Sequence, residues 1–199
     1  MRGRLIAFEG LDQSGKQTQA ELLREHLRAA GHKVRLLSFP DYGTSIGEEI
    51  ARALQGERDY GADVMQLLYV ANRYERRQEI ERWLDGGLML ICDRYLASSV
   101  AYGEAQNLDA AWLIDMQKYL PVPDLTILLD IAPERAAARK ISDRDKYERD
   151  LALLGRVRES YLRQSAAGWV VLDASGDRAA IAARVTAAVE AQLGPLSAP

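Results

Sequence analysis

Five short apolar runs, separated by longer amphipathic stretches, constrain the fold of this chain more than any other feature. The runs are RLIAFE (4–9), KVRLLSF (33–39), LMLICD (88–93), LTILLDI (125–131) and WVVLDA (169–174). Strands that helices cover on both faces have this nearly continuous apolar character. Helical spacing of apolar residues occurs between the runs, over 18–30, 62–85, 150–167 and 178–193. The alternation predicts an α/β protein with a mainly parallel sheet.

Composition limits the classes of protein and partner that remain. A length of 199 residues, with 48% hydrophobic and 28% charged residues, predicts one globular domain over 1–199. The net charge of −3 and the pI of about 5.5 give no basic surface for a nucleic-acid polymer. The single cysteine excludes an internal disulfide. No signal peptide is recognisable and no apolar run approaches the roughly 18 residues that span a bilayer, so we expect a cytoplasmic protein without membrane contact.

The segment FEGLDQSGKQTQ (8–19) follows the first apolar run and opens the first helical stretch. From Gly10 to Lys16 it has the Gly-x-x-x-x-Gly-Lys spacing of a P-loop. The glycines let backbone N–H groups point at phosphate oxygens, the helix N-terminus adds partial positive charge, and the lysine supplies a cation. The alternative is a glycine-rich turn with a solvated lysine. The predicted phosphate site, 10–18, consists of Gly10, Leu11, Asp12, Gln13, Ser14, Gly15, Lys16, Gln17 and Thr18.

Gln17 stands where a P-loop normally carries the Ser or Thr that holds Mg²⁺. Its amide oxygen could approach the ion directly or through water, and Thr18 is a second candidate. Because Mg²⁺ needs few protein ligands, our hypothesis is that nucleotide phosphates, water and carboxylates elsewhere hold most of it.

A second motif, DRYLASSVAY (93–102), stands at the end of the third apolar run. Asp93 occupies the place where P-loop proteins put a carboxylate near Mg²⁺. Arg94 can grip a phosphate through two parallel hydrogen bonds. The alternative is an aspartate that caps the next helix, followed by a surface arginine.

The pattern Asp-Arg-Tyr-x-x-Ser-x-x-Ala-Tyr resembles that of thymidylate kinases of the bacterial type. Other segments agree with this resemblance in the right order: FPDYGTSIGEEI (39–50), LLYVANRYE (67–75), DKYERD (145–150) and LDAS (172–175). The resemblance implies a P-loop nucleoside monophosphate kinase-like fold, with a five-stranded parallel sheet, helices on both faces and a short mobile lid at about 139–150. It also implies a homodimer that uses ATP and Mg²⁺ to convert dTMP to dTDP, for dTTP synthesis.

The resemblance further implies which residues bind dTMP. Tyr69 would stack on thymine, and Arg73, one helical turn later, would donate to a base carbonyl. Without the resemblance, these two would be a core residue and a solvated arginine. The other implied contacts are Asp12 with the 3′-hydroxyl or the metal, Phe39 and Pro40 as pocket walls, Arg94 with the phosphate, Ser98 and Ser99 with base or phosphate, and Tyr102 where a 2′-hydroxyl would sit.

The segment RKISDRDKYERD (139–150) has five basic and four acidic residues. These could form ion pairs along an ordinary helix face. Some family members carry a P-loop arginine where this chain has Gln13, and members without it resemble those that supply the cation from the lid. Arg144 and Arg149 are therefore our candidates for the transferring phosphoryl group, with Arg139 behind them. No general base is expected, because the acceptor is a phosphate oxygen that is already ionised.

Three other functions stay open on the residues alone. One is a kinase for another acceptor, either a different nucleoside monophosphate or a deoxynucleoside, whose hydroxyl would need a carboxylate base. Another is a P-loop regulator with slow hydrolysis, although the Asn-Lys-x-Asp motif of GTPase switches is absent from the sequence. The third is a nucleotide-binding structural module, which would leave the convergent arginines unexplained.

Overall fold

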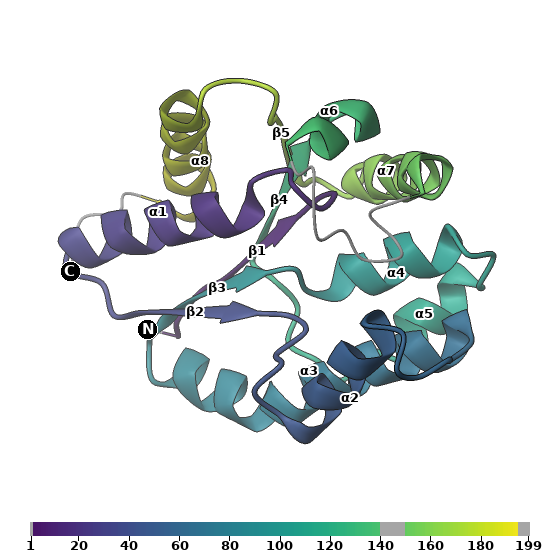
Figure 1. The fold of residues 1–199 in the computed structure, drawn as a ribbon. Helices are drawn as coiled ribbons and strands as arrows, with labels where there is room; N and C mark the ends of the chain where they lie inside the picture. The colour runs from purple at the N-terminus through teal and green to yellow at the C-terminus, as the bar shows by residue number, and fades with distance from the viewer. Residues whose placement is uncertain (1, 140–149, 195–199) are drawn as a thin grey trace.

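The computed structural model describes residues 2–139 and 150–194. Five strands form one parallel sheet in the order β2-β3-β1-β4-β5 (Figure 1). Their bounds are β1 Leu5–Glu9, β2 Val34–Ser38, β3 Met89–Asp93, β4 Leu125–Asp130 and β5 Val170–Asp173. Each strand lies inside one of the five apolar runs, so the predicted parallel sheet is confirmed.

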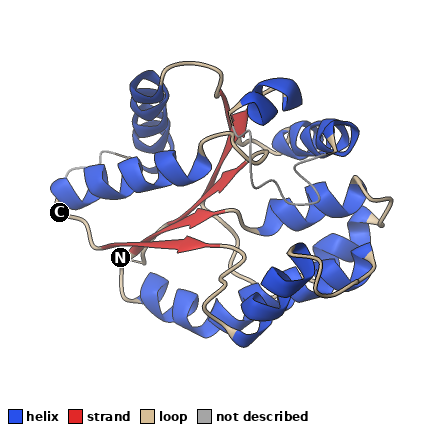
Figure 2. Cartoon of the chain, viewed as in Figure 1, coloured by secondary structure: helices blue, strands red, loops and turns tan. Residues whose placement is uncertain are grey.

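Helices connect the strands and cover the sheet (Figure 2). In the described residues they are α1 Lys16–Ala29, α2 Ser45–Leu54, α3 Ala62–Asp85, α4 Leu96–Glu104, α5 Ala110–Asp115, α6 Pro133–Ala138, α7 Leu151–Ser165 and α8 Arg178–Leu193. The helices expected over 62–85 and 178–193 have those bounds. The one expected from 18 begins two residues earlier, because the phosphate loop turns directly into α1.

The alternation of side chains along β1 builds a core on each face of the sheet. Ile6 and Phe8 pack in one cluster with Leu23 and Leu27 of α1, whereas Leu5 packs in another with residues of α3. All of these side chains are buried. In Figure 1, α1 and α8 accordingly lie on one side of the sheet, and α3 and α4 lie on the other.

The position of β1 in the sheet decides where a ligand can bind. It lies between β3 and β4, so the connections that leave the carboxyl ends of β1 and β3 start beside each other. Open parallel sheets bind ligands at such a switch point. The P-loop follows β1 and the DRYLASSVAY segment follows β3, so the fold brings the two motifs together.

Candidate active site

The phosphate loop runs from the end of β1 into α1. A Cβ on Gly10, which has φ +141°, would lie 2.6 Å from the carbonyl oxygen of Leu129. Gly15 caps α1 with φ 95° and offers no side chain to its first-turn N–H groups. Those N–H groups and the helix dipole make an anion site. This arrangement supports the phosphate-site prediction.

Lys16, the first residue of α1, is buried and folds back over the loop. Its Nζ donates to the carbonyl oxygen of Leu11 at 2.8 Å. It is therefore not the solvated lysine of the alternative interpretation. Burial and the nearby charge of Arg94 lower the pKa of Lys16 to about 8, although the carboxylates of Asp12 and Asp93 act in the opposite direction.

Arg94 and Asp12 join the two motifs. Arg94 Nη2 donates to Asp12 Oδ1 at 2.5 Å, and Nη1 donates to the carbonyl oxygen of Gly10 at 3.1 Å. Tyr102 Oη donates to Asp12 Oδ2 at 2.8 Å. Burial raises the pKa of Asp12, but the charges of Arg94 and Lys16 outweigh it and hold that pKa well below its usual range. Asp12 is thus a permanent anion beside the phosphate loop.

A cavity that is open to solvent lies beside this ion pair, and its space of about 560 Å³ includes the solvent at its mouth. All the residues expected to bind the acceptor line it: Asp12, Phe39, Pro40, Tyr69, Arg73, Arg94, Ser98, Ser99 and Tyr102. Tyr42, Leu54 and Gln66 also line it and were not predicted. Gln66 could have been suspected, since it precedes Tyr69 by three residues on the same helix and so shares its face.

Arg73 is buried rather than solvated. Its Nη1 donates to Ser99 Oγ at 2.8 Å and to Gln117 Oε1 at 3.3 Å. Its Nε is buried and has no hydrogen-bond partner within the described part of the chain. The alternative of a surface arginine is therefore wrong, and the side chain is fixed against α4 at the cavity wall.

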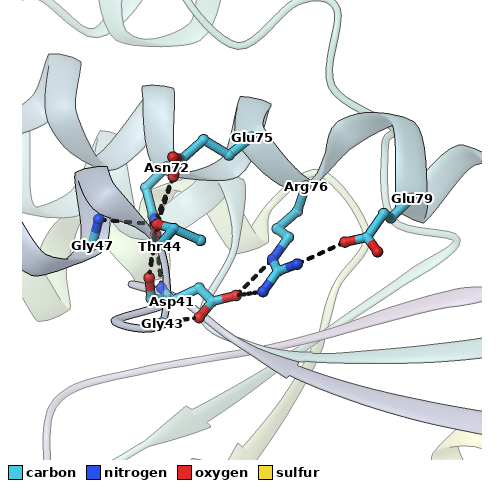
Figure 3. Close-up of polar contacts among 8 residues, drawn as sticks. All are labelled: Asp41, Gly43, Thr44, Gly47, Asn72, Glu75, Arg76 and Glu79. Carbon is cyan, nitrogen blue, oxygen red and sulfur yellow. Dashed lines mark hydrogen bonds and ion pairs between the residues drawn. The ribbon is translucent and has the colours of Figure 1, made fainter.

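The loop that follows β2 is attached to α3 by a network that is shown in Figure 3. Asn72 is fully buried; its Oδ1 accepts from the N–H of Asp41 at 2.7 Å, and its Nδ2 donates to Thr44 Oγ1 at 2.9 Å. Arg76 Nε donates to Asp41 Oδ2 at 2.7 Å. Since this loop carries Phe39 and Pro40, the network fixes one wall of the cavity relative to Tyr69 and Arg73.

The expected metal ligands provide oxygen donors of the kind that Mg²⁺ takes. Asp93 Oδ1 is buried and lacks a hydrogen-bond partner among the described residues. This orphaned carboxylate oxygen and the anionic Asp12 fit a magnesium site. Within residues 2–139 and 150–194, no group of three or more His, Cys, Asp or Glu side chains could hold a metal.

Gln17 does not point into the loop. Its side chain is exposed and donates to Glu21 Oε1 at 3.1 Å, one turn along α1. Thr18 is half-buried in the first turn of α1. The placement of the Gln17 side chain does not support a direct contact between Gln17 and Mg²⁺.

Arg139 connects the phosphate loop to the loop after β5. Its guanidinium donates to the carbonyl oxygen of Gln13 at 3.0 Å and to that of Ala174 at 2.7 Å. The other two lid candidates, Arg144 and Arg149, lie outside the described residues. The structure therefore places one of the three predicted lid arginines at the phosphate loop.

Transfer of a phosphoryl group between two nucleotides requires a phosphate loop and an acceptor pocket side by side, and both lie at the carboxyl edge of this sheet. The fold and the site define a P-loop nucleoside monophosphate kinase. A family model described as thymidylate kinase matches residues 8–185. The chain belongs to the thymidylate kinase family.

Individual relatives agree with the family. The chain is 39% identical to thymidylate kinase of Arabidopsis thaliana over 174 residues, which are 87% of this chain and 66% of that protein. It is 37% identical to the Schizosaccharomyces pombe enzyme, over 87% and 85% of the two chains. The solved structure of thymidylate kinase from Candida albicans has a TM-score of 0.83 and 28% identity, and the match covers 97% of this chain and 93% of that one.

These relatives are eukaryotic and do not support the bacterial type that the sequence led us to expect. In the described residues, no helix is both long and apolar enough to cross a membrane.

Proposed function

We propose that this protein transfers the γ-phosphoryl group of ATP to dTMP, giving dTDP and ADP for dTTP synthesis. The observation that carries the proposal is that the phosphate loop and the acceptor cavity share a wall. Asp12 belongs to the phosphate loop, lines the acceptor cavity and pairs with Arg94. A nucleotide in the loop and a nucleotide in the cavity would therefore meet at this ion pair.

Charge neutralisation is the main task of the residues at this junction. Lys16 meets the outer phosphates of ATP, and Arg94 meets the 5′-phosphate of dTMP. Because that acceptor is ionised at neutral pH, no protein group has to remove a proton. Catalysis then consists of positioning and charge stabilisation. Bound Mg²⁺ would neutralise phosphate charge, and Asp12 and Asp93 are the residues that would hold it.

The other cavity residues select the acceptor. Tyr69 stacks on the thymine ring, and Arg73 donates its unpartnered Nε–H to the base. Tyr102 blocks the position of a 2′-hydroxyl. Ser98 and Ser99 act on the ligand partly through the arginines to which they are hydrogen-bonded.

The lid segment supplies the remaining cation. Arg144 and Arg149 reach the transferring phosphoryl group, because Gln13 has no charge to offer there. Arg139 serves the ATP side, which its contacts with Gln13 and Ala174 support. Closure of the lid would exclude water, which would otherwise accept the phosphoryl group.

The finer parts of the proposal concern the whole protein. They are a single domain over 1–199, a homodimer, a cytoplasmic location and a cation from the lid. Gln13 supports the last of these, because its side chain in the phosphate loop carries no charge.

The testing experiment is steady-state release of ADP with ATP and Mg²⁺ and a panel of acceptors: dTMP, dUMP, ribose TMP, dCMP, AMP and thymidine. Several acceptors are needed, because the thymidylate kinase from Candida albicans has broad substrate specificity. We expect dTMP to give by far the highest kcat/KM and thymidine to give no turnover. ADP release that is independent of the acceptor, or absent with all of them, would refute the proposal.

A further inference from the structure

A buried carboxylate lies directly behind Arg94. Glu9 ends β1 and is fully buried. Its Oε1 accepts from the backbone N–H of Tyr95 at 2.9 Å. Its Oε2 accepts from Ser98 Oγ at 2.7 Å and from Tyr161 Oη at 3.2 Å. All three donors are uncharged, so the carboxylate orients neutral groups rather than forming an ion pair with them.

This carboxylate determines the direction of two hydroxyl groups. Ser98 Oγ and Tyr161 Oη lie 2.8 Å apart, and each has one proton to donate. Ser98 directs its proton to Glu9, and Tyr161 directs its own to Glu9 or to Ser98. In either arrangement both oxygens keep a lone pair that can accept from Arg94. Arg94 Nη1 donates to both oxygens at 3.2 Å. Burial and the charge of Glu9 raise the pKa of Tyr161, so the phenol keeps the proton that it donates.

The same contacts hold the backbone of Arg94. This residue has φ 64°, a left-handed conformation that is uncommon for a side chain of its size. Its N–H donates to the carbonyl oxygen of Phe8 at 2.9 Å, and the following N–H, that of Tyr95, donates to Glu9. Both backbone and guanidinium of Arg94 are therefore fixed from behind, while its Nη2 meets Asp12 and Tyr102 at the cavity.

We propose that Glu9 and Tyr161 are positioning residues that hold Arg94 ready for the 5′-phosphate of the acceptor. The inference rests on the proposed function. Neither residue lines the acceptor cavity, whereas Arg94 and Ser98 do. Tyr161 comes from α7, Ser98 from α4 and Glu9 from β1. The position of the Arg94 guanidinium therefore depends on the packing of α7 against α4. Loss of either residue weakens recognition of the phosphate but leaves recognition of the nucleoside intact.

The test compares dTMP with thymidine, which lacks the phosphate, as ligands of the full chain in titration calorimetry. In Tyr161→Phe, which removes one oxygen, we expect the Kd for dTMP to rise about tenfold, the effect of one hydrogen bond to a charged group. The Kd values for thymidine and for ATP should stay unchanged. Glu9→Gln, a second variant of unchanged size, should act in the same direction because its amide N–H would compete for the hydroxyl lone pairs.

Tyr60→Phe is the matched control. Tyr60 Oη also donates to a carboxylate, Glu49 Oε1 at 2.6 Å, but it lies away from Arg94 and outside the cavity lining. This variant should bind both ligands as the wild type does. The inference is wrong if Tyr161→Phe and Glu9→Gln leave the dTMP-to-thymidine affinity ratio at its wild-type value, or weaken both ligands equally. Equal wild-type affinity for dTMP and thymidine would instead refute the proposed function, and this inference with it.

Discussion

At the scale of single residues, the ammonium of Lys16 has a lowered pKa that bears directly on phosphate binding. Burial and the permanent charge of Arg94 beside it lower its pKa from 10.5 to about 8. The unfolded chain holds this proton up to about pH 10.5, whereas the folded chain releases it from about pH 8. The contribution of Lys16 to the free energy of unfolding therefore rises as the pH rises through this window.

Phosphate binding should reverse that shift. The negative charges of ATP next to Lys16 favour the ammonium form, so at about pH 8.5 the complex should take up a fraction of a proton. Calorimetric titration in buffers of different ionisation enthalpy measures this uptake. Lys16→Arg is the control, because an arginine is protonated throughout. Absence of uptake in the wild type, or equal uptake in the arginine variant, would contradict the assigned role of Lys16.

At the scale of elements, α3 carries much of the acceptor site. Its residues Tyr69 and Arg73 line the cavity, and Asn72 between them connects the helix to the loop that carries Phe39 and Pro40 (Figure 3). The buried amide of Asn72 thus holds two walls of the site together. Its loss should lower the stability of the folded chain, because a buried polar group without a hydrogen bond is more costly in free energy than an exposed one.

Replacement of Asn72 by alanine should loosen that loop. We expect the free energy of unfolding to fall by about 1–3 kcal/mol, the cost of leaving buried polar groups unpaired. KM for dTMP should rise severalfold more than KM for ATP, since the phosphate loop does not depend on this network. Gln78→Ala, exposed on the same helix, is the control. Equal changes in the two KM values would argue for a general loss of structure instead.

The lid segment gives a second prediction at this scale. If the lid supplies the missing cation, Arg144→Ala or Arg149→Ala should lower kcat at least about tenfold, which corresponds to roughly 1.4 kcal/mol. The reason is the loss of charge stabilisation at the transferring phosphoryl group. Steady-state kinetics at saturating ATP and dTMP measure it. If both variants keep nearly full kcat, the lid assignment is wrong.

At the scale of the whole molecule, the acceptor cavity joins parts of the chain that are far apart in sequence. The phosphate loop, the loop after β2, α3 and α4 all contribute residues to it. A ligand in the cavity therefore contacts several elements at once, and it should stabilise the folded chain as a unit.

The resulting prediction concerns thermal stability. At a dTMP concentration about 100 times its Kd, binding should add about 2.7 kcal/mol to the free energy of unfolding. For a chain of this length, that corresponds to a rise in Tm of roughly 5–10 °C. Differential scanning fluorimetry without ATP measures it, with AMP as the comparison ligand. A P-loop switch or a structural module would show no rise with dTMP.

Much of this architecture could be predicted from local patterns. The five strands lie in the five apolar runs. The acceptor residues came from the family resemblance instead, and all of them line one cavity. The sequence does not decide whether Arg73 contacts the ligand or lies in solvent, because helical spacing does not show which neighbouring element covers a face of the helix. The direction of Gln17 could not be predicted either, because it depends on a hydrogen bond from its amide nitrogen to Glu21, one turn along α1.

The sequence by itself determined the strands, the main helices and the phosphate loop, because periodicity, glycine positions and the lysine act over a few neighbouring residues. Only the tertiary structure decided what surrounds Arg94. Tyr161 and Glu9 are 152 positions apart in the chain, yet their side chains meet behind the arginine. No local pattern marks either residue, because their hydrogen bonds exist only once α7 has packed on α4 and on β4.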